Sequence, residues 1–311
     1  MSSRTTKRAT TVTGLIITVL LLAGCAGERP PVKKVLVIGI DGVRPDVLAE
    51  VPTPAIDALI SEGAFSGRVI TQAQTISGPG WSSMLTGVWP EKHGVTSNNF
   101  TGNNYALYPD FLTRLELIDG EFSTFAVVDW APLGSEASGG PLLSDTIDVK
   151  LDFDGDQLGY QEGDNRSVAA AVRFLEHQDP DAAFVYIGYP DVAAHDNGGR
   201  SQEYYQSIEN ADLHVGRLVA ALRNRPTYER EDWLILVSTD HGHRDGGGHG
   251  GDSPEERTVF FLASGLSVTQ GTLPRDVNIV DVAITALAHL GIAIDPTWHL
   301  DGRVSGLEAA N

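Results

Sequence analysis

Cysteine is almost absent from this chain: its 311 residues include a single one, Cys25. An intrachain disulfide and a thiolate-based zinc site are therefore both excluded. A bound metal would have to use Asp, Glu and His side chains. Zn²⁺ suits such oxygen and nitrogen ligands best, and Mn²⁺ is the alternative.

Basic residues are also scarce, since 22 Lys and Arg stand against 41 Asp and Glu, which gives a formal charge of −19. A nucleic-acid-binding protein needs clustered Lys and Arg to meet the phosphate backbone. The charge therefore argues against nucleic acid as a partner. Apolar residues make up 41% of the chain, a globular rather than a disordered composition.

An apolar segment near the N-terminus, residues 15–23, is too short to span a bilayer as a stable helix. It follows basic residues and no acidic one, as in a secretory signal peptide. The residues Leu22-Ala-Gly-Cys25 resemble a bacterial lipoprotein box, which implies that Cys25 becomes the first mature residue and carries a lipid. We expect a signal peptide over residues 1–24, a tether over 25–34, and anchoring to a bacterial membrane outside the cytoplasm. The alternative is an ordinary signal peptide with an incidental cysteine.

Three continuous apolar runs have the length of strands, at residues 35–40, 184–187 and 233–237. Such runs are typical of strands that are covered on both faces, as in a parallel sheet. The sequence therefore predicts an α/β fold with a mainly parallel central sheet and helices on both faces.

Helical patterns lie between these runs. Apolar residues recur at spacings of three and four over residues 208–222, which indicates one buried helix face. A second helical pattern covers residues 168–175, and we expect Asp164 or Asn165 to be its N-cap.

We expect residues 35–311 to form one large domain. Residues 99–163 are less regular and rich in Gly, Asp and Tyr. This composition indicates a small inserted cap region within the domain.

Each of the three apolar runs leads into an aspartate, namely Asp41, Asp191 and Asp240. Ligands of parallel α/β sheets bind beyond the carboxyl ends of the strands, so these carboxylates converge if the strands are neighbours. A single aspartate in this position would more simply cap the following helix. Three together would repel one another, and a bound cation would relieve that repulsion.

Histidines near these aspartates could complete a set of metal ligands. One follows the second aspartate by four residues and another follows the third directly, namely His195 and His241. A third candidate, His249, lies in a glycine-rich run that lets an imidazole approach a site closely. His243 is the alternative to His249, and we favour His249.

A serine begins the next candidate segment, Ser77-Gly-Pro79-Gly-Trp. Pro79 suits the first turn of a short helix and Gly87 its end. Ser77 would then lie at a helix N-terminus, where free N–H groups and the helix dipole favour an anion. A serine hydroxyl needs a base or a metal to act as a nucleophile, and a two-metal site supplies the metal. The alternative is that Ser77 is only an N-cap.

Together these motifs resemble the alkaline phosphatase superfamily, and within it the type I phosphodiesterase/nucleotide pyrophosphatase branch. In order, the matching segments are Ile-Asp41-Gly-Val-Arg-Pro-Asp, Ser77-Gly-Pro-Gly-Trp, Asp191-x-x-x-His195, Thr-Asp240-His241-Gly and Gly-Gly-His249-Gly-Gly. The resemblance implies an alkaline-phosphatase-like fold and a secreted hydrolase of small phosphorylated substrates, either phosphodiesters or nucleotide pyrophosphates.

The same resemblance implies two divalent metal ions, most simply Zn²⁺, and a ligand set for each. One ion would be held by Asp41, Ser77, Asp240 and His241, and the other by Asp191, His195 and His249. It also implies that Asn98, 21 residues after Ser77, binds a phosphoryl oxygen. The same count from Thr75 reaches Thr96 instead, so the spacing favours Ser77 as the nucleophile. The implied mechanism is a double in-line displacement through a phosphoserine.

Two departures from the family pattern keep other functions open. Sulfatases of this superfamily carry a modified Cys or Ser in a C/S-x-P-x-R motif, and Trp81 stands here where arginine is expected, so sulfate-ester hydrolysis is the runner-up. Monoester phosphatases add Lys or Arg, but residues 99–165 hold only Arg114 and Lys150, which favours diesters over monoesters. A non-catalytic binding lipoprotein of the same fold is the remaining alternative.

Overall fold

The computed structural model describes residues 30–274 and 276–308, so the expected signal peptide and lipoprotein box at Cys25 lie outside the described residues. Its strands are β1 (Val32–Ile40), β2 (Ala64–Ile70), β3 (Thr124–Val128), β4 (Val149–Asp152), β5 (Ala182–Ile187), β6 (Glu231–Ser238), β7 (Thr258–Ser264) and β8 (Gly271–Thr272). Its α-helices are α1 (Pro45–Leu48), α2 (Pro54–Glu62), α3 (Ser77–Thr86), α4 (Pro90–His93), α5 (Phe111–Ile118), α6 (Ala131–Gly134), α7 (Gly155–Leu158), α8 (Tyr160–His177), α9 (Tyr189–Asn197), α10 (Gln202–Arg223), α11 (Pro254–Arg257) and α12 (Asp281–His289). Among the helices just given, none is long and apolar enough to cross a membrane.

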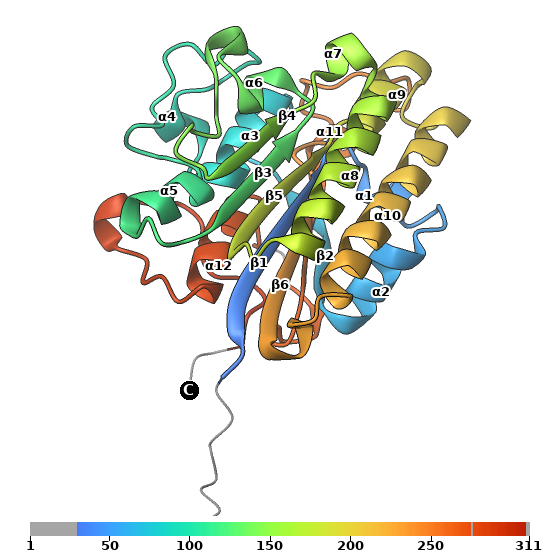
Figure 1. Ribbon diagram of the computed structural model, residues 1–311. Helices are drawn as coiled ribbons and strands as arrows, with labels where there is room; N and C mark the ends of the chain where they lie inside the picture. The colour runs from blue at the N-terminus through green and yellow to red at the C-terminus, as the bar shows by residue number, and fades with distance from the viewer. Residues whose placement is uncertain (1–29, 275, 309–311) are drawn as a thin grey trace, which may run out of the picture. The chain divides into compact units, whose positions relative to one another are not determined.

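The strands form one sheet in the order β4-β3-β5-β1-β6-β7-β2-β8 (Figure 1). All neighbouring pairs are parallel except the two pairs that β7 makes with β6 and β2. The predicted α/β fold with a mainly parallel sheet is therefore confirmed.

Side chains of β1 alternate between two apolar cores, one on each face of the sheet. Val35 and Val37 pack in the core that α3, α5 and α12 cover, whereas Leu36 and Ile38 pack in the core of α2, α8 and α10. Figure 1 shows these two groups of helices on opposite sides of the sheet. Burial on both faces explains why residues 35–40 of β1 are continuously apolar rather than alternating between apolar and polar.

Residues 99–163 differ from the expected inserted cap because they supply part of the sheet. β3 and β4 both lie in this segment and pair in parallel with each other, and β3 also pairs with β5. All five residues of β3 are buried, but the run is short and polar loops flank it, so no long apolar pattern marks it in the sequence. The remainder of the segment consists of loops, the helices α5, α6 and α7 and the first turn of α8.

Helix α8 begins at Tyr160, earlier than the pattern at residues 168–175 indicates. Asp164 is therefore inside the helix rather than at its N-cap. Its carboxylate is buried and accepts hydrogen bonds from the backbone of the next helix, α9.

The order of the strands places three candidate aspartates at one edge. β1 lies between β5 and β6 and is parallel to both, so the carboxyl ends of the three strands meet at the same edge. Asp41, Asp191 and Asp240 follow these ends. This edge is where a ligand site of a parallel sheet is expected.

Gly39, near the end of β1, makes room for the Trp81 side chain of α3. A Cβ at position 39 would lie 2.4 Å from the Trp81 ring. The ring is fully buried, and its Nε1 donates a hydrogen bond of 2.8 Å to Asp41. The packing of α3 on β1 thus supports a carboxylate at the edge of the sheet.

Replacing Gly39 with alanine is expected to lower the free energy of unfolding by about 1–3 kcal/mol, because a methyl group would overpack the core against Trp81. Urea unfolding measures this loss. Gly120→Ala is the control, since a Cβ there meets nothing within 4 Å. Equal unfolding midpoints for the two variants would contradict this account of the packing.

Candidate metal centre

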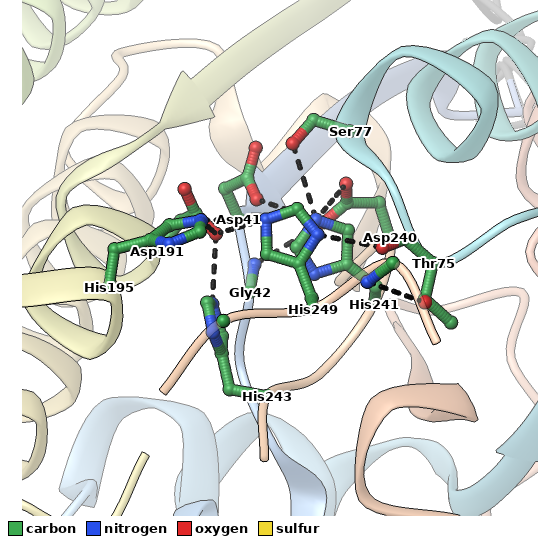
Figure 2. Close-up of polar contacts among 12 residues, drawn as sticks. Asp41, Gly42, Thr75, Ser77, Asp191, His195, Asp240, His241, His243 and His249 are labelled. Carbon is green, nitrogen blue, oxygen red and sulfur yellow. Dashed lines mark hydrogen bonds and ion pairs between the residues drawn. The ribbon is translucent and has the colours of Figure 1, made fainter. Parts of the chain in front are cut away.

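Four segments of the chain converge at the carboxyl edge of the sheet (Figure 2). They are the end of β1, the start of α3, helix α9 and the loop after β6. The side chains that they bring together include all seven metal ligands expected from the sequence: Asp41, Ser77, Asp191, His195, Asp240, His241 and His249.

His241 is the centre of the first metal group, which consists of Asp41, Ser77, Asp240 and His241. The Nε2 atom of His241 lies 3.5 Å from Asp41 Oδ1 and 3.3 Å from Asp240 Oδ2. It is also 3.2 Å from Ser77 Oγ. Two carboxylates, an imidazole and a hydroxyl therefore point at one small volume, as ligands of a single ion would.

Two buried carboxylate oxygens in this group test whether a cation fits. Asp41 Oδ2 accepts hydrogen bonds from Trp81 Nε1 (2.8 Å) and the Tyr186 hydroxyl (2.7 Å). Asp240 Oδ1 accepts one from the backbone N–H of Gly42. The other oxygens, Asp41 Oδ1 and Asp240 Oδ2, are buried without a hydrogen-bond partner among the described residues. Such oxygens are costly to bury, so these two fit as ligands of a divalent ion.

Electrostatics in the first metal group also favour a cation. Burial, reinforced by the charge of Asp191, raises the pKa of Asp41 to about 7. Burial and the charge of Asp41 raise the pKa of Asp240 well above its ordinary value. Burial lowers the pKa of the His241 imidazole. A divalent ion would reverse the shifts of the carboxylates by stabilising their charged forms.

Asp191 is the centre of the second metal group, which consists of Asp191, His195 and His249. Asp191 Oδ1 lies 3.4 Å from His249 Nε2 and 3.6 Å from His195 Nε2. The two imidazole Nε2 atoms are 2.8 Å apart. Burial would raise the pKa of Asp191, but the hydrogen bond from His243, together with the nearby imidazoles of His249 and His241, holds it below its ordinary value. The carboxylate is thus kept charged, as a metal ligand must be.

His243 also reaches this group, and its hydrogen bonds distinguish it from His249. The Nδ1 atom of His249 lies 2.7 Å from the carbonyl oxygen of Thr75, which can only accept, so Nδ1 carries the proton. In the neutral imidazole, the form that binds a metal, Nε2 then has a lone pair that faces Asp191. His243 Nε2 lies 2.8 Å from Asp191 Oδ1 and donates to it, an arrangement that orients a ligating carboxylate.

Asn98 lies beside the start of α3, where the sequence places it. Its Oδ1 accepts a hydrogen bond of 2.8 Å from the backbone N–H of Gly78. This bond fixes the amide group and leaves the donor, Nδ2, as the other polar group of the side chain. Asn98 is exposed, whereas the neighbouring Ser77 is buried at the base of the site.

Two side chains, Tyr204 and Arg44, hold the backbone around the candidate ligands in place. The buried Tyr204 hydroxyl donates to the carbonyl oxygen of Gly42 (2.7 Å) and accepts from the N–H of Arg44 (2.9 Å). Arg44 Nη1 in turn donates to the carbonyl oxygen of His243 (3.1 Å). Arg44 lies within the Asp41 motif, where it is expected to fix the turn, whereas Tyr204 lies in an ordinary helical pattern and is the one that sequence reasoning missed.

Curated relatives resemble this chain over most of its length. Human ectonucleotide pyrophosphatase/phosphodiesterase family member 5 is 25% identical over 237 residues, which are 73% of this chain and 48% of that protein. Bis(5′-adenosyl)-triphosphatase of Bos taurus is 26% identical over 245 residues, 71% of this chain and 50% of that protein. GPI ethanolamine phosphate transferase 1 of Candida glabrata is 25% identical over 267 residues, 78% and 28% of the two chains. The chain thus spans about half or less of the length of these relatives.

Solved structures share the fold at low sequence identity. Murine ectonucleotide pyrophosphatase/phosphodiesterase 5 has a TM-score of 0.64 at 17% identity, covering 85% of this chain and 96% of that one. A 2-O GAG sulfatase has a TM-score of 0.67 at 13% identity, covering 89% and 73%. A phosphonate monoester hydrolase from Silicibacter pomeroyi has a TM-score of 0.62 at 17% identity, covering 88% and 75%. At these identities the likeness is one of fold.

The match to a protein family is more specific. Residues 35–121 and 122–256 match the type I phosphodiesterase / nucleotide pyrophosphatase family, and every residue of the two metal groups lies within the match. The chain therefore belongs to the type I phosphodiesterase / nucleotide pyrophosphatase family.

Proposed function

We propose that this protein is a metal-dependent hydrolase of phosphodiesters or nucleotide-like pyrophosphates in which Ser77 is the nucleophile. The observation that carries the proposal is the convergence of the two metal groups beside a serine at a helix N-terminus. One murine neighbour in fold is described as an inactive threonine-to-alanine variant in complex with AMP. That description supports a hydroxyl nucleophile and a nucleotide-like substrate here.

The proposal assigns one divalent ion to each metal group, and Zn²⁺ suits the Asp and His donors best. When bound, the two ions would lower the pKa of the Ser77 hydroxyl and neutralise the charge of the phosphoryl group. The unpartnered oxygens of Asp41 and Asp240 and the lone pair of His249 support this assignment.

In the proposed reaction, Ser77 Oγ attacks the phosphorus atom in line with the leaving group. The Oγ–P bond forms, the bond from phosphorus to the leaving oxygen breaks, and that oxygen takes up a proton. Asn98 Nδ2 and the N-terminus of α3 stabilise the charge on the phosphoryl oxygens. Water then attacks the phosphoserine from the opposite side and restores the Ser77 hydroxyl.

The positions of two cationic side chains support diesters over monoesters. Arg114 stacks on the ring of Trp298, with its guanidinium carbon 4.5 Å from the ring centroid. Lys150 donates to the carbonyl oxygen of Leu143 and pairs with Asp145. Both are therefore committed elsewhere, whereas the additional charge of a phosphate monoester would require a cation at the site.

We also propose that the protein is anchored by lipid at Cys25 to a bacterial membrane, outside the cytoplasm. The basic start, the short apolar segment 15–23 and the sequence Leu22-Ala-Gly-Cys25 support this proposal.

Ser77→Ala is expected to lower turnover by at least about a thousandfold, as loss of a covalent nucleophile does, while the protein still binds its metals. Ser77→Thr keeps a hydroxyl and is expected to retain turnover. Steady-state kinetics and metal analysis of the two purified variants test the assignment. Turnover by the alanine variant at the rate of the native protein would exclude Ser77 as the nucleophile.

His249→Ala is expected to reduce the metal content toward one ion per chain, because it removes a ligand of the second metal group. His243→Ala is expected to retain both ions at saturation but to bind the second about 10- to 100-fold more weakly, the usual effect of losing a residue that orients a ligand. Equilibrium dialysis followed by metal analysis distinguishes the two. The reverse result would make His243 the ligand.

The substrate class is tested with three chromogenic esters: a phosphate diester, a phosphate monoester and a sulfate monoester. Residues 26–311 loaded with Zn²⁺ are expected to prefer the diester and to lose activity when a chelator removes the metal. Preference for the monoester would keep the site and change the substrate. Preference for the sulfate ester, which the sulfatase among the fold neighbours makes a relevant comparison, would overturn the phosphodiesterase proposal.

A further inference from the structure

A fourth strand also leads into an aspartate at this edge of the sheet. Asp129 follows β3 and is fully buried. Neither of its carboxylate oxygens has a hydrogen-bond partner among the described residues. Glycines make room for it, because a Cβ at Gly163 would lie 2.4 Å from Asp129 Oδ2 and one at Gly188 would lie 3.1 Å from Oδ1. The proposed reaction gives this carboxyl group no role.

Its neighbour Asp164, on α8, caps a different helix. Asp164 Oδ1 accepts a hydrogen bond of 2.7 Å from the N–H of Gly188, and Oδ2 accepts one of 3.2 Å from the N–H of Tyr189. These are the N-terminal N–H groups of α9, whose own N-cap residue is a glycine without a side chain. A carboxylate at these free N–H groups is also stabilised by the positive end of the helix dipole. Asp164 thus supplies the cap that α9 lacks.

The two carboxyl groups lie side by side, because both border Gly188: its N–H donates to Asp164 Oδ1, and a Cβ on it would lie 3.1 Å from Asp129 Oδ1. Two carboxylates can make such a contact only if they share a proton or a cation. Asp164 receives two N–H donors whereas Asp129 receives none, so the negative charge is better stabilised on Asp164 and the proton belongs on Asp129. Burial raises the pKa of Asp164 to about 7, and burial together with the Asp164 charge raises the pKa of Asp129 well above its ordinary value.

The other ionisable groups around the pair also favour a proton there. Asp41 and Asp152 add negative charge from the ends of β1 and β4, and each raises the pKa of Asp129. Tyr160 of α8 and Tyr186 of β5 pack beside Gly188 and carry no charge of their own at neutral pH. A proton on Asp129 removes one negative charge from this acidic edge.

We propose that protonated Asp129 holds ionised Asp164 as the N-terminal cap of α9, and that this pair positions Asp191 and His195. Both ligands lie on α9, Asp191 in its first turn and His195 in its last. Pro190, between the capped residues and Asp191, has no N–H, so the cap acts on the two N–H groups that precede it. The inference rests on the proposed function only in taking Asp191 and His195 as ligands of the second ion.

The test makes the same substitution, aspartate to asparagine, at each member of the pair. Asp164→Asn removes the negative charge and replaces one of the two acceptor oxygens with an NH₂ donor, so only one of the two backbone N–H groups keeps its acceptor. Asp129→Asn replaces one neutral hydrogen-bond donor with another of the same size. Asp152→Asn, an exposed carboxylate at the end of β4, controls for the loss of one negative charge. For each Zn²⁺-loaded protein, chelator-buffered titration gives the affinity for the second ion, and hydrogen exchange gives the protection of the α9 amides.

Asp164→Asn is expected to weaken binding of the second ion by about 10- to 100-fold, as loss of a supporting partner of a ligand does, and to speed exchange in α9. Asp129→Asn and Asp152→Asn are expected to match the native protein in both measurements. If the substitutions acted only by lowering the overall stability of the protein, Asp164→Asn and Asp129→Asn would not differ in these two measurements.

Three results would overturn the inference. The first is that Asp164→Asn keeps the native affinity for the second ion and the native exchange of α9. The second is that Asp129→Asn weakens both as much as Asp164→Asn does. The third is that Asp129→Asn loses an additional ion, which would mean that the pair shares a cation. If the native protein binds fewer than two ions, the proposed function fails. Hydrogen exchange of the α9 amides in Asp164→Asn and Asp129→Asn still decides the role of the pair in that case.

Discussion

Burial of several carboxylates at one edge of a sheet is the constraint on which the rest of this structure depends. Asp41 and Asp240 are almost completely buried there, and Asp191 lies beside them. Each negative charge needs a hydrogen-bond donor, a proton or a cation. Trp81 and Tyr186 satisfy one oxygen of Asp41, and His243 satisfies Asp191. The oxygens left over on Asp41 and Asp240 are the ones directed at the position proposed for a metal ion.

Strand order creates this concentration of charge, and the helices on each face supply the means to control it. β1 lies between β5 and β6 and is parallel to both, so three strand ends meet at one edge. α3 packs on one face and brings the serine and the indole of Trp81 to the ligands, whereas α8 and α10 bring Asp164 and Tyr204 from the other. The site is therefore supported by both cores, and its geometry depends on the packing of each.

Long apolar runs and the residues directly after them were enough to predict the central strands and the carboxylates at their ends. Contacts between distant segments were not predictable in this way. Asp164 fits the sequence pattern of a cap for its own helix, yet it caps a helix that begins 25 residues later in the chain. The short β3 gives too weak a pattern to reveal that Asp129 also ends a strand. Sequence left His243 and His249 as alternatives, and the contact of His249 with the carbonyl oxygen of Thr75 is what supports His249 in the proposed ligand set.

The direction of β1 has a consequence for access to the site. The strand begins at Val32 and ends at Ile40, immediately before Asp41, and nine residues of extended chain cover roughly 30 Å. A protein held at its N-terminal end therefore presents the metal groups at the far end of the strand. If the proposed lipid anchor at Cys25 holds the chain before β1, the carboxyl edge of the sheet lies at the end of this strand opposite to the attached end.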